Sequence, residues 1–397
     1  MRTLVLGVST RAMVESAVRG GHDVVAVDFF GDRDQALVAE SYALERDLGL
    51  PPTAEGLGEA ARRVAAEAVV YGANLENHAA VVARLAGEHE VLGNPPEVLR
   101  EVRDWALLRR ACEESGIAHP VTLLPGEEAG AVTGRWLRKR VRSGGGHGVG
   151  RWDGRPLDED HVLQSEVDGV PASVAFVADG RDCRILGLSE QLIGLAALGS
   201  SGFGWCGNIL PLGLSPAESA AANAEVRRAA STLTRRFGLR GVNGMDVVIG
   251  RDRRGAVRPH VVEVNPRYSG SMELLEDAGG VNVFSAHVDA CAGRLPDAGA
   301  ARSAAPEPVG KAIVYARRRV TTPDTGAWLA RGVRDVPRSR ETIAAGHPIC
   351  TVAAAGRDRR ECLAGLLARA AEVYAESEAR KEERRERPTH LDHRTYA

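Results

Sequence analysis

Glu263, Asn265 and Arg267 lie in the stretch VVEVNPRYSG and have the types and spacing best suited to chemistry. In an extended strand, side chains two residues apart lie on one face, so Glu263 and Asn265 would point together into a site. Val262 and Val264 would then face the core. Two hard oxygen ligands beside a fixed cation suit a magnesium ion that carries a polyphosphate. The alternative is a half-buried strand that ends at a solvated turn.

Asp246 is a second acidic residue in an otherwise apolar strand candidate, residues 239–249. A carboxylate in such a strand is costly unless it is paired or bound to a metal. The turn-like sequence RDRRG separates this strand from that of Glu263, so an antiparallel hairpin would place the two carboxylates side by side. Because like charges so close need a cation between them, the pairing favours a divalent metal.

A glycine-rich loop follows a strand candidate that carries Lys139, one of only three lysines in the chain. The loop has five glycines in the seven residues 144–150. Glycine lets backbone N–H groups approach an anion closely, and a preceding cation completes a phosphate cradle. The alternative is a flexible surface hairpin, which glycine also favours.

The elements that position these residues begin with a β-α-β pattern. Residues 3–8 form an apolar run, residues 11–19 have helical spacing, and residues 24–27 form a second buried strand. The pattern predicts a doubly wound parallel sheet with a ligand-binding edge at the strand ends. The intervening loop, GVSTR, is not GxGxxG and gives no support for a dinucleotide. Its Ser9 and Thr10 favour helix capping over anion binding.

Three aspartates follow the second strand: Asp28, Asp32 and Asp34. They are compatible with a solvated turn or with the rim of a substrate pocket, and the residues alone do not decide between the two.

Further segments are predicted from periodicity and breakers. Strands are expected at residues 68–71, 162–167, 173–177, 311–316 and 349–353, and helices at 78–86, 96–115, 218–237 and 360–378. A hairpin or a sharp bend is expected near Asp168, a long glycine-rich loop at 199–208, and boundaries at the double proline 95–96 and at 295–308. A charged run at 380–387 predicts a frayed, disordered tail.

Composition excludes several classes of protein. A chain of 397 residues predicts two or three domains, and 51 Lys+Arg against 53 Asp+Glu gives no electrostatic case for nucleic acid or an anionic membrane. The six cysteines are scattered, without zinc spacing, and predict reduced, mostly buried thiols in a cytoplasmic protein. No apolar stretch approaches the about 20 residues of a spanning helix.

In this order the pieces resemble the ATP-grasp superfamily over about residues 1–355. The resemblance implies an α/β, Rossmann-like pre-ATP-grasp domain and an α+β ATP-grasp domain with a mobile lid, followed by a small C-terminal α/β segment and a charged tail. Their expected bounds are 1–95, 96–305 with the lid at about 118–162, 306–375 and 376–397. More narrowly, GVSTR at 7–11, DFFGDRD at 28–34, Glu76–Asn77 and Gly93–Asn94 resemble predicted ATP-dependent carboligases, distantly similar to biotin carboxylase and tyramine–glutamate ligase.

The same resemblance assigns roles to single residues. Lys139 would contact the α- and β-phosphates and, with Arg267 at the γ-phosphate or acylphosphate, would be catalytic. The magnesium ligands, with manganese as an alternative ion, would be Asp246, Glu263 and Asn265. The lid residues over the β- and γ-phosphates would be Ser143, Gly144, Gly145, Gly146, His147 and Gly148, and those of the adenine hinge Gln164, Glu166 and Val167.

Two positions depart from the pattern. Many relatives carry Lys in the helix before the lid, where this chain has Asp104 and Trp105, and an acidic ribose contact is absent where Pro171 falls. Asp168 would substitute for that contact.

The resemblance implies an ATP-dependent carboxylate–amine ligase that forms an amide through an acylphosphate and releases ADP and phosphate. The alternatives are a carboxylase acting through carboxyphosphate and a non-catalytic ATP-binding module. The expected partners are a small carboxylate and an amine, with no nucleic acid and no membrane, and a homodimer is left open.

Overall fold

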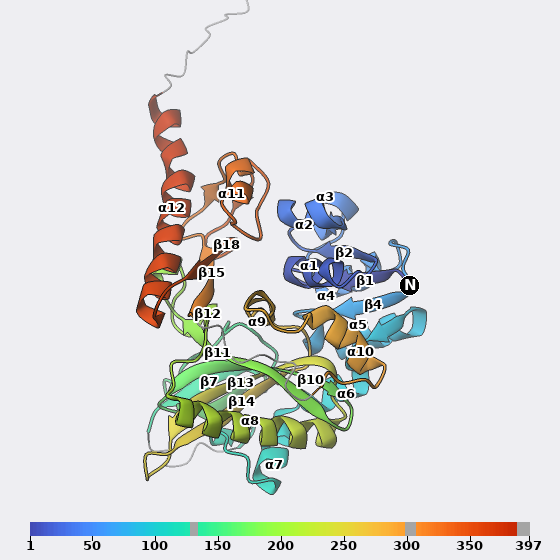
Figure 1. The fold of residues 1–397 in the computed structure, drawn as a ribbon, viewed down its shortest axis with the longest axis vertical. Coiled ribbons are helices and arrows are strands. Elements are labelled where there is room, and N and C mark those ends of the chain that lie inside the picture. Colours follow the sequence, from blue (N-terminus) through green and yellow to red (C-terminus); the bar gives the residue numbers. More distant parts are fainter. Residues whose placement is uncertain (128–133, 298–306, 387–397) are drawn as a thin grey trace, which may run out of the picture.

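The computed structural model of the protein describes residues 1–127, 134–297 and 307–386, with side chains as far as Ser377. The strands fall into a five-stranded, a seven-stranded, a four-stranded and a two-stranded sheet. Figure 1 shows the N-terminal domain and the long C-terminal helix on opposite sides of the molecule, above the large central sheet.

The N-terminal domain is a parallel sheet in the order β3-β2-β1-β4-β5, with the pairings β1–β2, β1–β4, β2–β3 and β4–β5 all parallel. Its strands are β1 (Thr3–Leu6), β2 (Val24–Asp28), β3 (Glu40–Ala43), β4 (Ala68–Tyr71) and β5 (Glu90–Leu92). Its helices are α1 (Arg11–Arg19), α2 (Arg33–Val38), α3 (Leu44–Leu48), α4 (Ala54–Ala60) and α5 (Ala79–Glu88). The strands β1, β2 and β4 are buried along their whole length, as a sheet covered on both faces requires. The expected α/β domain is confirmed.

The central sheet is antiparallel and runs in the order β14-β13-β10-β11-β12-β15-β18. Its strands are β10 (Val170–Asp179), β11 (Cys183–Ile193), β12 (Trp205–Leu210), β13 (Arg240–Arg251), β14 (Val257–Asn265), β15 (Val309–Tyr315) and β18 (Pro348–Ala355). On one face, α8 (Pro216–Phe237) packs its alanine-rich side into an apolar core. On the other face, α9 (Met272–Asp277) and α10 (Val283–Cys291) cover one end and join the sheet to the N-terminal domain. The remainder of that face is the floor of a cavity.

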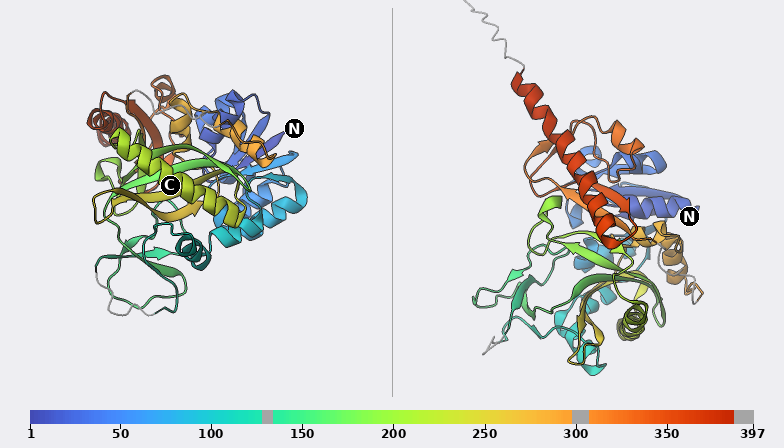
Figure 2. Two further views of the ribbon diagram at one scale, coloured as in Figure 1. Left: turned by 60° about the horizontal axis from the view of Figure 1, so that its bottom comes forward. Right: turned by 60° about the vertical axis from the view of Figure 1, so that its left-hand side comes forward.

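The lid is a separate four-stranded sheet in the order β6-β9-β7-β8, which projects from the bottom of the left-hand view in Figure 2. Its strands are β6 (Thr122–Leu123), β7 (Trp136–Arg140), β8 (Gly150–Arg151) and β9 (His161–Ser165). β9 and β10 belong to different sheets, so the connection near Asp168 is a bend between sheets and not a hairpin.

The C-terminal segment contributes β15 and β18 to the central sheet and adds β16 (Val320–Thr321), α11 (Gly326–Ala330), β17 (Thr342–Ile343) and α12 (Arg359–Glu386). The helix α12 is longer than expected, because the charged run continues it to Glu386, and it protrudes from the molecule in Figure 1 and in the right-hand view of Figure 2. Residues 387–397 of the expected tail and residues 298–306 of the expected boundary lie outside the described residues.

The single helix expected at residues 96–115 is wrong. The structure has two helices, α6 (Pro96–Val102) and α7 (Trp105–Glu114), with a break at Arg103 and Asp104. The Asp104 carboxylate accepts hydrogen bonds from the backbone N–H groups of Ala106 (2.8 Å) and Leu107 (3.1 Å) and so caps a new helix.

The glycine-rich loop expected at 199–208 ends earlier than predicted, because Trp205 begins β12 between β11 and β15.

All six cysteines are free thiols, buried except for the partly exposed Cys291. In the described part of the chain, every helix is too short or too polar to cross a bilayer.

Candidate active site

A cavity of about 1420 Å³ lies between the strand ends of the N-terminal domain, the central sheet, the lid and the C-terminal segment. A site for one small molecule usually occupies about 300–1,000 Å³, so there is room for a nucleotide and more. With the single exception of Asp168, every residue assigned above to nucleotide, metal or catalysis lines this cavity. They are Lys139, Ser143, Gly144, Gly145, Gly146, His147, Gly148, Gln164, Glu166, Val167, Asp246, Glu263, Asn265 and Arg267.

The hairpin β13–β14 places Asp246 directly opposite Glu263, as the sequence predicted. The register then shifts, so that Val247 faces Val261 and Val262 is left in a bulge. Val262 lines the cavity, and the expectation that it faces the core is wrong because a bulge reverses the alternation of side chains. The core positions are Val261 and Val264.

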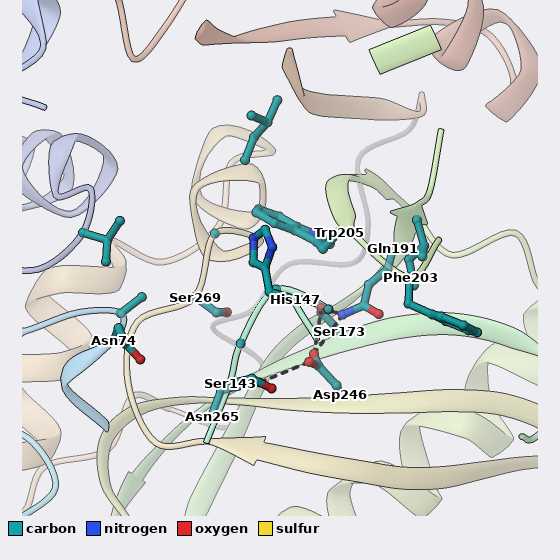
Figure 3. A pocket seen from close by; sticks show the side chains of 18 of the residues that line it. Asn74, Ser143, His147, Ser173, Gln191, Phe203, Trp205, Asp246, Asn265 and Ser269 are labelled. Atoms are coloured by element: carbon teal, nitrogen blue, oxygen red, sulfur yellow. Dashed lines mark hydrogen bonds between the residues drawn. The ribbon is translucent and has the colours of Figure 1, made fainter. Parts of the chain in front are cut away.

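Asp246 is held by three side chains on the cavity floor, as the dashed lines in Figure 3 show. Its carboxylate accepts hydrogen bonds from Ser173 Oγ (3.2 Å), Gln191 Nε2 (2.9 Å) and Asn265 Nδ2 (3.1 Å). Burial and the facing carboxylate of Glu263 raise the pKa of Asp246 to about 7. Such a raised pKa is expected where two half-buried carboxylates face each other with insufficient positive charge between them.

The pKa of Glu263 is shifted in the opposite direction to that of Asp246. Burial acts to raise its pKa, but the positive charges of Arg103 and Lys139 outweigh burial and lower it. Among the described residues, no group of three or more His, Cys, Asp or Glu side chains forms a metal site. Two carboxylates and the Asn265 amide oxygen nevertheless supply the hard oxygen donors that magnesium prefers, and a divalent ion would relieve their repulsion. The residues present therefore fit the ion.

Lys139 reaches from the lid toward the two carboxylates. Its ammonium donates a hydrogen bond of 2.6 Å to Gln164 Oε1, and Gln164 in turn donates to Thr122 Oγ1 at 3.2 Å. Burial lowers the pKa of Lys139, whereas the carboxylates of Glu263 and Asp246 act to raise it. The pairing of β7 with β9 thus directs a cation from the lid at the metal-ligand candidates on the floor.

The glycine loop of the lid docks on the start of β12. The Gly145 carbonyl accepts a hydrogen bond of 3.0 Å from the backbone N–H of Trp205. Gly146 has a φ of +76°, and a Cβ on it would lie 1.9 Å from the Phe203 carbonyl oxygen. Only glycine fits this approach. Figure 3 shows His147, Phe203 and Trp205 around the cavity at this point.

Arg267 connects the central sheet with the N-terminal domain. Its Nε donates to Glu76 Oε1 (2.9 Å), and its other nitrogens donate to Asn265 Oδ1 (3.3 Å) and the Tyr268 carbonyl (3.1 Å). Glu76 is only 2% exposed and follows β4. The pair fixes the guanidinium beside the Asn265 side chain.

The residues of the proposed adenine hinge lie in the cavity, whereas the residue proposed to contact the ribose does not. Gln164, Glu166 and Val167 line the cavity, with the Glu166 carboxylate 2.9 Å from Arg135 Nε. The Asp168 side chain is 89% exposed and forms an ion pair with Arg135 outside the cavity, so the structure gives the suggested ribose role no support.

Three residues of the site escaped the sequence reasoning. Arg103 donates to the Ser143 carbonyl of the lid (3.0 Å) and lies 3.4 Å from Glu263 Oε2, so it ties the lid loop to a metal-ligand candidate. It was hidden inside a predicted helix, although the capping residue Asp104 was a usable signal for the break. Ser173 and Gln191 carry no signal of their own, since only strand pairing brings them to Asp246.

A family model described as an ATP-grasp domain matches residues 102–271. No sequence among the curated proteins matches the chain. Among solved structures, the fold is similar to pyruvate carboxylase from Rhizobium etli, with 16% identity and a TM-score of 0.70 over 93% of this chain and 37% of that one. This chain therefore spans little more than a third of that enzyme's length.

Two further similar structures match over most of both chains. Biotin carboxylase from Campylobacter jejuni has 13% identity and a TM-score of 0.67, covering 91% of this chain and 89% of that one. L-Amino acid ligase from Bacillus licheniformis has 16% identity and a TM-score of 0.64, covering 94% of this chain and 98% of that one. At these identities the likeness establishes the fold.

Proposed function

This chain contains an ATP-grasp domain, and from that premise we propose that it is an ATP-dependent ligase that joins a carboxylate to an amine. The observation that carries the proposal is the register of β13 and β14, which places Asp246 opposite Glu263 with Lys139 directed at both carboxylates. A surface hairpin or a solvated turn would not bury this arrangement in a cavity of about 1420 Å³.

We assign Asp246, Glu263 and Asn265 as the side chains that hold magnesium. When bound there, the ion would neutralise the charge of the nucleotide phosphates and make the γ-phosphorus more electrophilic.

Two side chains of this chain would bind the nucleotide phosphates for the first step, the transfer of the γ-phosphoryl group. Lys139 and Arg267 both line the cavity; Lys139 would bind phosphate oxygens from the lid side, and Arg267 from the side of the N-terminal domain. In the reaction, a carboxylate oxygen of the acid attacks the γ-phosphorus, the bond to the β-phosphate oxygen breaks, and ADP leaves with that electron pair. The product is an acylphosphate.

In the second step, the amine attacks the acyl carbon, phosphate leaves with the oxygen of the original carboxylate, and the amine's proton passes to the departing phosphate or to solvent. Arg267 and the backbone that follows it at Ser269–Ser271 line the cavity and would stabilise the developing oxyanion. Docking of the glycine loop on β12 would keep water from the acylphosphate.

A matrix of small acids and amines tests the proposal by following ADP release. The expected result is ADP formation that requires both an acid and an amine, with the amide appearing in equal amount. Bicarbonate-dependent ADP release without an organic acid would instead identify a carboxylase. Tight binding of MgATP without ADP release under any condition would identify a binding module.

A further inference from the structure

We propose that Asp32 binds a protonated nitrogen on one of the two substrates, so that the substrate class includes a compound with an ammonium group remote from the reacting carbon. This inference rests on the function proposed above and concerns the part of the cavity that the N-terminal domain lines. Asp32 follows β2, lines the cavity and is only 5% exposed. In the described chain, no hydrogen bond or ion pair involves its carboxylate, which does not cap the helix that follows it.

The neighbouring carboxylates are all satisfied, which sets Asp32 apart. Asp28 accepts hydrogen bonds from the side chain and N–H of Thr10 and from the N–H groups of the turn after β2. Asp34 accepts the backbone N–H groups of Asp335 and Val336 at 2.8 and 2.9 Å.

The guanidinium that acts to lower the pKa of Asp32, that of Arg11, is already engaged elsewhere. Arg11 is fully buried and donates to Asp335 (2.8 Å), Glu273 (2.5 Å) and Glu15 (3.0 Å). It therefore has little capacity left for Asp32. Another cation that lines the cavity, Lys311, is itself paired with Glu273.

The negative charge around Asp32 indicates which kind of ligand would bind there. A buried, unpaired carboxylate is costly, and its three acidic neighbours, Asp335, Asp28 and Asp34, add to the negative potential. Burial first, and then those three charges, raise the pKa of Asp32 well above its usual range. A bound ammonium group would supply both the missing donors and the missing charge, which a neutral donor would not do.

The order of the strands indicates whether a group at Asp32 would lie near the reacting group or remote from it. β2 and β4 lie on either side of β1, so their ends are two strand spacings apart, on the order of 10 Å. Asp32 follows β2, whereas Glu76, the partner of Arg267, follows β4. A nitrogen at Asp32 would thus be remote from a reacting group held at Arg267, which favours a terminal ammonium group over the α-amino group of an activated α-carboxylate.

Matched pairs of compounds test this inference by calorimetry on the full-length protein with a non-hydrolysable ATP analogue and magnesium. The amine pairs are putrescine with butylamine, cadaverine with pentylamine, and L-lysine with L-norleucine. The acid pair is ε-aminocaproate with caproate. Either in the amine pairs or in the acid pair, we expect the compound with the additional ammonium group to bind at least about tenfold more tightly than its partner compound. This is the scale of a hydrogen bond between charged groups.

The variants are Asp32→Asn, which keeps the shape of the side chain, and the control Asp23→Asn. Asp23 is exposed and precedes the same strand, β2, at its opposite end. Asp32→Asn should abolish the preference for the ammonium form, and Asp23→Asn should retain it. Because the variant removes the cost of burying an acidic group that has no partner, Asp32→Asn should also raise the melting temperature of the free protein, by about 2 °C.

The possible outcomes distinguish a failure of this inference from a failure of the proposed ligase function. An Asp32-dependent preference without ADP release from any acid–amine pair would leave this inference standing and refute the ligase. ADP release from neutral substrates, with no ammonium preference or with a preference that survives in Asp32→Asn, would refute this inference alone. Failure of every ammonium-bearing probe to bind the wild-type protein would also overturn it.

Discussion

Gly146 is the position where a single methyl group should disable the lid. A Cβ there would lie 1.9 Å from the Phe203 carbonyl oxygen and 2.7 Å from its carbonyl carbon, and both atoms belong to the backbone. The φ of +76° adds about 1–2 kcal/mol for a residue other than glycine. Displacement of the loop would also break the hydrogen bond between Trp205 and the Gly145 carbonyl, at about 0.5–1.5 kcal/mol.

The two contributions add to about 1.5–3.5 kcal/mol against the docked lid, which corresponds to about 10- to 300-fold weaker binding of an ATP analogue. The assay is calorimetry on Gly146→Ala, with limited proteolysis of residues 143–150 with and without the analogue. Gly144→Ala is the matched control, because a Cβ on Gly144 meets nothing within 4 Å. Wild-type affinity in Gly146→Ala, or equal losses in both variants, would refute the reasoning.

Three further predictions concern the floor of the cavity, the lid lysine and the buried histidine. Glu263→Gln should lower ATP turnover by at least about 100-fold if its charge holds magnesium, whereas Glu225→Gln on the exposed side of α8 should not; steady-state ADP release measures both. Lys139→Met should weaken ATP by about 2–3 kcal/mol and Lys139→Arg by less, measured by calorimetry. Burial lowers the pKa of His287 to about 4, so up to about 3 kcal/mol of stability should be lost as pH falls from about 6.5 to 4. Denaturant melts of wild type and His287→Gln across that range measure this, and an equally steep acid loss in the variant would remove the histidine as the cause.

The sequence predicted the pairing of the two carboxylates on the cavity floor, because the information for that pairing is local. Period-two alternation and a short turn are enough to pair Asp246 with Glu263, and the structure has that register. A bulge is not visible in alternation, so Val262 was assigned to the wrong side. Lys139 was recognised as a rare residue type before a glycine loop, and both lie on the cavity.

What the sequence did not reveal depends on contacts between distant segments. Arg103 acquires its role only because the chain breaks between α6 and α7 and returns beside β14. Gln191 reaches Asp246 across 55 positions through the order of strands in the central sheet. The aspartates after β2 were compatible with a turn or a pocket, and only the packing of the C-terminal segment against them distinguishes Asp34, which it satisfies, from Asp32, which it leaves facing the cavity.

The measurement that tests the central claim most directly follows the oxygen atoms of the acid. An acid that supports amide formation is labelled with oxygen-18 in both carboxylate oxygens and incubated with ATP, magnesium and the amine. Activation through an acylphosphate predicts that one labelled oxygen appears in the released phosphate for each amide formed. Phosphate without label, or label in AMP, would contradict the account.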